Sequence, residues 1–255
     1  MKKIEKTLLW IDRRIENYLS LLTQIVRVYT KDNKKLKEAE SLLRTALRTA
    51  FFLDFYSETN DNDFLQEANR YKELMYSGMS EKDRQDLQLI ERQIIELFDY
   101  EKRIWIKVKK GQQVSDAEIE RFWQMKSADA LFYGRLTKIF TGNKDFTLPI
   151  YVYTQILDID RDLREYEKDF QENSPNILFM KLSQKIPVDQ IPPLKRDAIR
   201  EAICLGLHLD LERVVEKLSK QVSKYNFEEC YFLKDAIKQR YREFNINFLK
   251  RNVRL

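Results

Sequence analysis

Acidic residues recur at helical spacing in a late stretch of this chain. The positions i, i+4, i+7 and i+11 are occupied by Asp158, Asp162, Glu165 and Asp169. Residues so spaced stand over one another on one side of a helix, and four like charges in such a column repel. Carboxylate oxygens are the ligands that hard divalent cations prefer, and Mg²⁺ typically takes one or two of them beside water and substrate phosphate. The spacing therefore indicates a cation site on this helix.

A second acidic set comes earlier in the chain, where Asp54, Glu58 and Asp61 have the spacing i, i+4 and i+7. Extending the same helix backwards puts Leu47 on the line of Asp54, so we expect these carboxylates to continue an apolar stripe that faces the core. Capping offers another interpretation, because Asp61 and Asp63 can cap the helix that follows. Capping does not account for Asp54 and Glu58, and both interpretations stay open.

The elements that position these residues are long amphipathic helices. The apolar stripe of the late acidic helix, expected over Tyr151–Phe170, consists of Val152, Ile156, Ile159, Leu163, Tyr166 and Phe170. The early set ends a helix that Asp32 or Asn33 can cap. Between them, Ser115 and Glu118 form a capping-box pattern that starts a helix expected to continue unbroken to Gly142. Small residues in that helix indicate a close neighbour.

Composition favours a helical protein. The chain of 255 residues is 43% hydrophobic and 34% charged, with 5 Gly and 5 Pro. So few turn-forming residues imply long elements, and we predict an all-α fold. We expect a single large antiparallel bundle of about 8–10 helices around a central apolar cavity, forming one domain over 1–255. The proline-containing segment 187–193 offers an alternative boundary.

Charge and cysteine content indicate which ligands and which cellular compartment are compatible with the sequence. The net charge of +5 and a pI near 8.9 tolerate a phosphorylated ligand or an anionic membrane surface without requiring either. The amino-terminal helix has charges among its apolar residues, so it does not resemble a secretion signal. No apolar run reaches the roughly 20 residues that span a bilayer. We therefore expect a cytoplasmic protein with Cys204 and Cys230 reduced.

Aromatic residues lie near both acidic sets in the sequence, among them Phe51, Phe55 and Tyr151. Apolar walls that exclude water and aromatic faces that support a carbocation are what a metal-assisted departure of diphosphate needs. We expect these three residues to line a substrate site. The alternative is that they are core residues, as aromatics at helical spacing usually are.

The order of these motifs resembles that of class I isoprenoid synthases. Asp54-Phe-Tyr-Ser-Glu58 is similar to the first DxxxD-type motif of the squalene and phytoene synthase branch, and Asp158-Ile-Asp-Arg-Asp162 is similar to the second. Gln155-Ile-Leu-Asp158, with Asp162, also resembles the QIxDDxxD helix of polyprenyl diphosphate synthases. Lys126-Ser127 is similar to the Lys-Thr pair of that second group.

This resemblance implies an enzyme that uses Mg²⁺ to ionise an allylic prenyl diphosphate. The metal ligands would be Asp54, Glu58, Asp158 and Asp162, with Asp61 and Glu165 in support. The substrate would be bound by Phe51, Phe55, Lys126, Tyr151 and Gln155. A homodimer and peripheral membrane association are compatible with it, and no nucleic-acid partner is expected.

A non-enzymatic scaffold or adaptor is the competing hypothesis, in which the acidic columns are solvated faces. Ile159 stands where the polyprenyl pattern has its second Asp, which is compatible with a degenerate synthase fold. The segment from Leu218 to Ile237 also resembles the UVR helical hairpin, a protein-interaction module of excision-repair proteins. Under this hypothesis, a partner protein binds the carboxyl-terminal hairpin.

Overall fold

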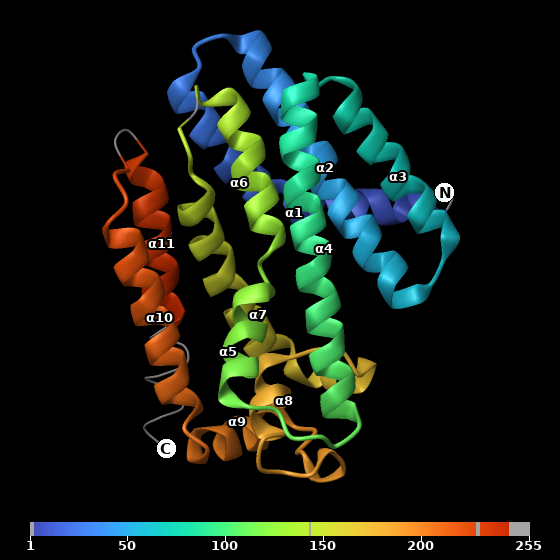
Figure 1. Cartoon of the computed structure of the whole chain (residues 1–255), viewed down its shortest axis with the longest axis vertical. Helices are drawn as coiled ribbons and strands as arrows, with labels where there is room; N and C mark the ends of the chain where they lie inside the picture. The colour runs from blue at the N-terminus through green and yellow to red at the C-terminus, as the bar shows by residue number, and fades with distance from the viewer. Residues whose placement is uncertain (1–2, 143, 228–229, 245–255) are drawn as a thin grey trace. The chain divides into compact units, whose positions relative to one another are not determined.

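The computed structural model describes residues 3–142, 144–227 and 230–244, and every regular element among them is a helix (Figure 1). The all-α prediction is confirmed. In chain order the helices are α1 (Lys3–Tyr29), α2 (Asn33–Thr59), α3 (Asn62–Ser77), α4 (Glu81–Lys109), α5 (Asp116–Met125), α6 (Asp129–Phe140), α7 (Thr147–Glu172), α8 (Ile177–Leu182), the short 3₁₀ helix η1 (Val188–Gln190), α9 (Lys195–Cys204), α10 (Leu207–Ser223) and α11 (Tyr231–Phe244).

The chain divides into two compact units. Unit 1 consists of Met1–Glu91 and Leu131–Thr147, and unit 2 of Arg92–Ala130 and Leu148–Leu255. The proline-containing segment 187–193 lies within unit 2. The expected single bundle and its central cavity stay predictions.

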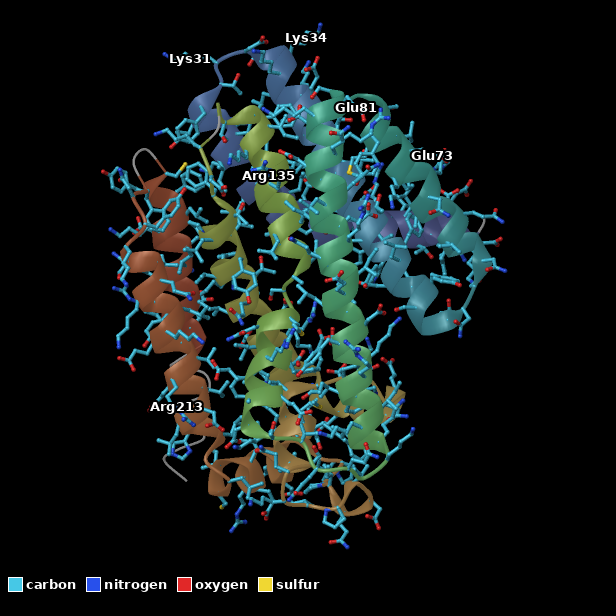
Figure 2. All side chains as sticks on the ribbon, in the orientation of Figure 1. Lys31, Lys34, Glu73, Glu81, Arg135 and Arg213 are labelled. Atoms are coloured by element: carbon cyan, nitrogen blue, oxygen red, sulfur yellow. The ribbon has the colours of Figure 1, made fainter. Side chains whose placement is uncertain are left out.

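Unit 1 is built on the pairing of α1 with α2 and of α2 with α3. Asp32 caps α2, as expected, by accepting hydrogen bonds from the backbone N–H groups of Lys34 and Lys35. Arg48 of α2 donates twice to the carboxylate of Asp12 in α1, at 2.8 Å each, which fixes the register of the two helices. Charged side chains such as Lys31, Lys34 and Glu73 stay on the solvent side (Figure 2).

The small residues between Ser115 and Gly142 predict a close neighbour, and the structure shows one at Gly134 in unit 1, where Thr147 approaches the helix. A Cβ atom added to Gly134 would lie 2.5 Å from the Cα of Thr147, well inside contact distance. The space beside α6 is therefore filled by backbone, which cannot move aside as a flexible side chain can.

Replacing Gly134 with alanine should therefore destabilise the protein by about 1–3 kcal/mol, the usual cost of overpacking. Denaturant unfolding measures the effect. Gly78→Ala is the matched control, because Gly78 has an ordinary negative φ and no atom within 4 Å of the added Cβ. Equal stability of the two variants would show that the approach at Gly134 is not tight.

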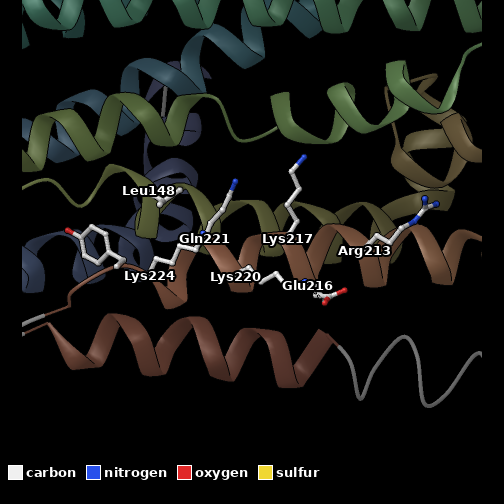
Figure 3. A pocket seen from close by; sticks show the side chains of 8 residues that line it. Leu148, Arg213, Glu216, Lys217, Lys220, Gln221 and Lys224 are labelled. Carbon is white, nitrogen blue, oxygen red and sulfur yellow. Dashed lines mark ion pairs between the residues drawn. The ribbon is translucent and has the colours of Figure 1, made fainter.

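Unit 2 contains α5 and the helices from α7 onward, including the acidic helix α7. Ser115 and Glu118 form the predicted capping box at the start of α5. The expectation of one unbroken helix to Gly142 was wrong, because the chain leaves the helix at residues 126–128 and restarts as α6. α10 and α11 run side by side (Figures 1 and 3).

None of the helices in the described ranges combines the length and the apolar character needed to cross a bilayer.

Candidate functional site

The late acidic column lies on α7 within unit 2. Asp162 is 2% exposed and Asp158 is 9% exposed, while Glu165 and Asp169 are half-buried. The apolar stripe from Val152 to Tyr166 is buried, as expected for the core-facing side of an amphipathic helix. Carboxylates this deeply buried need compensating partners.

Asp162 finds its partner in Lys126, which sits in the break between α5 and α6. The two form an ion pair whose side chains are 3% and 9% exposed respectively. The same carboxylate oxygen accepts a hydrogen bond at 2.9 Å from the backbone N–H of Ile177, in the first turn of α8. Lys126 also donates to the carbonyl oxygen of Pro175 at 3.3 Å. The buried charge of Asp162 is therefore both paired and hydrogen-bonded.

Asp158 contacts Ser127, which follows Lys126 in the break between α5 and α6. Ser127 is fully buried and donates to the carboxylate of Asp158 at 2.6 Å. The other carboxylate oxygen lies 3.1 Å from the guanidinium of Arg161. Arg161 can reach Asp158 because a residue three positions on is its neighbour on the helix surface. Arg164 pairs with Asp160 instead.

Gln155 and Tyr151 connect α7 to the end of α5. The last carbonyl groups of a helix have no partner within it. Gln155 donates to the carbonyl oxygen of Trp123 at 3.0 Å, and Tyr151 donates to that of Gln124 at 2.5 Å. These two predicted substrate-binding residues thus stabilise the end of α5, which positions the break that follows. The amide oxygen of Gln155 is buried and has no hydrogen-bond partner among the described residues.

Glu101 of α4 joins this cluster. Burial raises the pKa of Glu101, and the nearby carboxylates of Asp162 and Asp158 raise it further against the opposing field of Lys126. Burial likewise raises the pKa of Asp158. The sequence analysis missed Glu101, although it stands at the helical position between Leu97 and Ile104 where the apolar stripe of α4 is interrupted. We call Glu101, Lys126, Ser127, Asp158, Arg161, Asp162, Asp169 and Asn176 the α7 cluster.

Asn176 and Asp169 close the far end of the α7 cluster. Asn176 caps α8 and donates at 2.8 Å to the backbone carbonyl of Asp162 and at 2.6 Å to the carboxylate of Asp169. Burial raises the pKa of Asp169 to about 6. Both residues fix the direction in which the chain leaves α7, since α8 begins where Asn176 is held.

A raised pKa in the folded state predicts a pH dependence. The protonated carboxyl group of Asp169 contributes to the stability of the folded protein. This contribution is fully present below the ordinary pKa of 3.8 and is lost as the pH rises through about 6. The free energy of unfolding of Asp169→Asn minus that of the wild type should therefore increase by roughly 1–2 kcal/mol when the pH is raised from 4 to 7.5. Denaturant unfolding of both proteins across this range measures the difference, and a difference that stays constant would contradict the assignment.

The early acidic set lies in unit 1, on α2 and at the start of α3. Asp54 is exposed, so the expectation that it faces the core was wrong. Asp61 caps α3 by accepting from the backbone N–H of Asp63, as the capping interpretation predicts, and it pairs with Lys3. These contacts lower the pKa of Asp61. The side chain of Glu58 is outside the part of the chain that the structure describes.

Phe51 and Phe55 are half-buried on the same helix as Asp54. Both pack edge-on against the ring of Trp10 in α1, with ring centroids 5.9 Å and 5.5 Å apart. Phe55 also contacts Phe64 of α3. Their described contacts are those of core aromatics, and their predicted role in substrate binding stays a prediction.

The α7 cluster contains two neighbouring carboxylates, Asp158 and Asp162, of the kind that Mg²⁺ binds. In the described ranges, no three His, Cys, Asp or Glu residues are grouped to hold a metal on their own. Mg²⁺ usually needs only one or two carboxylates, with water and phosphate completing its shell. Asp158 and Asp162 are neighbours on one face of α7, and the carboxylates of the α7 cluster outnumber its two cations.

Comparisons of this chain with protein-family models, with curated proteins and with solved structures found no match.

Proposed function

We propose that this protein is a class I isoprenoid synthase-like enzyme, which ionises an allylic prenyl diphosphate with the help of Mg²⁺ at the α7 cluster. One observation carries the proposal. Lys126 contacts Asp162 and Ser127 contacts Asp158. The Lys-Ser pair and the acidic helix each resemble a separate motif of the same enzyme class, and their meeting in the fold is what that class of site requires.

The residues of the cluster have complementary roles in this proposal. Asp158 and Asp162 would hold Mg²⁺, which supplies neutralisation of the charge that develops on the departing diphosphate. An ammonium group has three donors, and the structure uses two of those of Lys126, on Asp162 and Pro175. The third makes no hydrogen bond with a described residue, and in this proposal it would donate to a phosphate oxygen. Ser127 orients Asp158, and Asn176 fixes the end of the acidic helix.

The early set also has a role in the proposal. Asp54, Glu58 and Asp61 would act as metal ligands in unit 1, and Glu165 would support Asp158 and Asp162 on α7. The substrate-binding role stays part of the proposal for Tyr151 and Gln155 in unit 2, and separately for Phe51 and Phe55 in unit 1. Because Asp54 is exposed in unit 1 and the α7 cluster lies in unit 2, substitution of Asp54 tests the early set separately.

A second function is favoured by a different observation. Asp158 and Asp162 already have protein partners, namely Ser127, Arg161 and Lys126. A cluster whose two central carboxylates already have protein partners can serve to hold α5, α7 and α8 together, as in a scaffold or adaptor built on a degenerate synthase fold. In that case the protein binds a partner and turns over no diphosphate.

Release of diphosphate separates the two functions. Purified protein is incubated with farnesyl or geranylgeranyl diphosphate, in Mg²⁺ and in EDTA, and apolar products are extracted. The enzyme proposal expects release that requires Mg²⁺ and a hydrocarbon or prenyl-alcohol product. Absence of release with both substrates favours the scaffold, for which capture of a partner protein is the next measurement.

A further inference from the structure

A groove of about 640 Å³ runs along α10 within unit 2 (Figure 3). None of the residues that line it belongs to the α7 cluster. Its volume is in the range of small-molecule sites. The residues that give it its character are Arg213, Glu216, Lys217, Lys220, Lys224 and Tyr225. Four of these six side chains are cationic.

The four cations form a column on one side of α10. Arg213, Lys217, Lys220 and Lys224 occupy positions i, i+4, i+7 and i+11. At a rise of 1.5 Å per residue, the column is about 16 Å long. Figure 3 shows Arg213 and Lys217 extending away from the helix on one side, while Lys220 lies beside Glu216. The buried stripe of α10, from Leu207 to Val222, anchors the helix so that this column stays on the outside.

The cations remain accessible although three of them have acidic neighbours. The side chain of Arg213 is 75% exposed, that of Lys220 is 71% and that of Lys217 is 52%. Lys220 pairs with Glu216, and Lys217 pairs with Glu120 of α5, at 2.7 Å each. Exposed pairs of this kind are weak and rearrange readily.

The charge balance of the groove is positive. Arg213 shares the carboxylate of Asp210 with the buried ammonium of Lys181, which lies 2.6 Å from it. Asp210 therefore does not serve Arg213 alone, although Lys181 also lies 4.0 Å from the carboxylate of Asp116. Lys224 forms no ion pair with another described residue. Only Glu216 contributes a carboxylate to the lining, against four cations.

The sequence shows the same concentration of charge. Residues 207–255 contain eleven Lys and Arg and seven Asp and Glu, so they account for four of the five net positive charges of the chain. An uneven distribution of this sort is typical of a region that binds anions.

We propose that the α10 groove binds a ligand that carries several phosphate groups in a row. A column of about 16 Å, with cations one helical turn apart, is longer than one phosphate and fits successive phosphates. Lysine ammonium groups act as point charges toward phosphate and require no planar partner. The phosphates can belong to a free polyphosphorylated compound or to neighbouring headgroups of an anionic lipid surface.

The test uses tripolyphosphate as the probe. The full chain is titrated with it by calorimetry in EDTA, at low salt and again at higher salt. We expect binding that weakens as the salt concentration rises, because the contacts are exposed charges. The triple variant Lys217→Gln, Lys220→Gln, Lys224→Gln should bind about 100-fold more weakly, at roughly fivefold for each charge removed.

A control variant removes the same net charge elsewhere on unit 2. Lys102→Gln, Lys110→Gln, Lys185→Gln changes three exposed residues outside the groove and should bind like the wild type. Vesicles of phosphatidylcholine with phosphatidic acid, compared with phosphatidylcholine alone, identify the source of the phosphate. If the wild type binds the acidic vesicles but not tripolyphosphate, and the groove variant does not bind the vesicles, the ligand of the groove is a lipid headgroup.

The proposal is overturned if neither probe binds, or if the groove variant and the control variant bind equally. It goes beyond the proposed synthase activity. Because the titration contains no Mg²⁺ and depends on the α10 lysines, its failure leaves the measurement of diphosphate release at the α7 cluster unaffected.

Discussion

Replacing Lys126 with methionine should destabilise the protein by about 3–5 kcal/mol, because it leaves the carboxylate of Asp162 buried without a counter-charge. Methionine keeps the length and much of the volume of the lysine stem, so the loss reflects charge more than a cavity. Denaturant unfolding at neutral pH measures the change in the free energy of unfolding.

Two controls show that the ion pair is responsible. The double variant Lys126→Met, Asp162→Asn should recover most of the lost stability, because asparagine is neutral and still accepts the hydrogen bond from Ile177. Lys220→Met breaks an exposed pair and should cost no more than about 1 kcal/mol. A double variant as unstable as the sum of its single variants would contradict a direct coupling between Lys126 and Asp162.

Asp158→Asn and Asp162→Asn should each lower the rate of diphosphate release by about 100- to 1,000-fold. Several kcal/mol of charge stabilisation in the transition state is the usual contribution of a bound metal, and each tenfold in rate corresponds to about 1.4 kcal/mol. Asparagine is nearly isosteric with aspartate and can accept the hydrogen bond from Ser127, so the fold around Asp158 should persist. Steady-state release in saturating Mg²⁺ measures the effect.

Asp160→Asn is the matched control for these variants. Asp160 is on the same helix and receives the same substitution, but it pairs with Arg164 away from the α7 cluster. It should release diphosphate at close to the wild-type rate. If Asp158→Asn were as active as Asp160→Asn, the α7 carboxylates would have no part in the reaction.

Most of the helices could be predicted because their signals are local. The apolar period of α7, the Asp32 cap and the capping box at Ser115 and Glu118 each depend on residues a few positions apart. Local energetics decide such features whatever the rest of the chain does. The starts of α2 and α5 and both ends of α7 therefore agreed with expectation to within a few residues.

The break at residues 126–128 could not be predicted for the opposite reason. It contains no glycine or proline, and the helix end is stabilised by Gln155 and Tyr151, which lie some 27–32 positions away in sequence. Tertiary hydrogen bonds here override a helical pattern that would otherwise continue. This break is also what turns Lys126 and Ser127 toward α7.

The candidate site was predictable in part. Helical spacing identified Asp158 and Asp162, and the Lys126-Ser127 pair was noticed, but nothing in the spacing showed which carboxylate each would contact. The inward direction expected for Asp54 failed because apolar positions earlier in α2 do not fix the exposure of its last two turns. Exposure at the end of a helix depends on where its neighbours stop.

The measurement that tests the central claim most directly is the binding of inorganic diphosphate to the α7 cluster. It is made by calorimetry, with and without Mg²⁺, in the Lys217→Gln, Lys220→Gln, Lys224→Gln background so that the α10 groove does not contribute. The account predicts binding that requires Mg²⁺ and is lost in Asp158→Asn. Absence of binding in Mg²⁺, or equal binding by the Asp158→Asn variant, would contradict it.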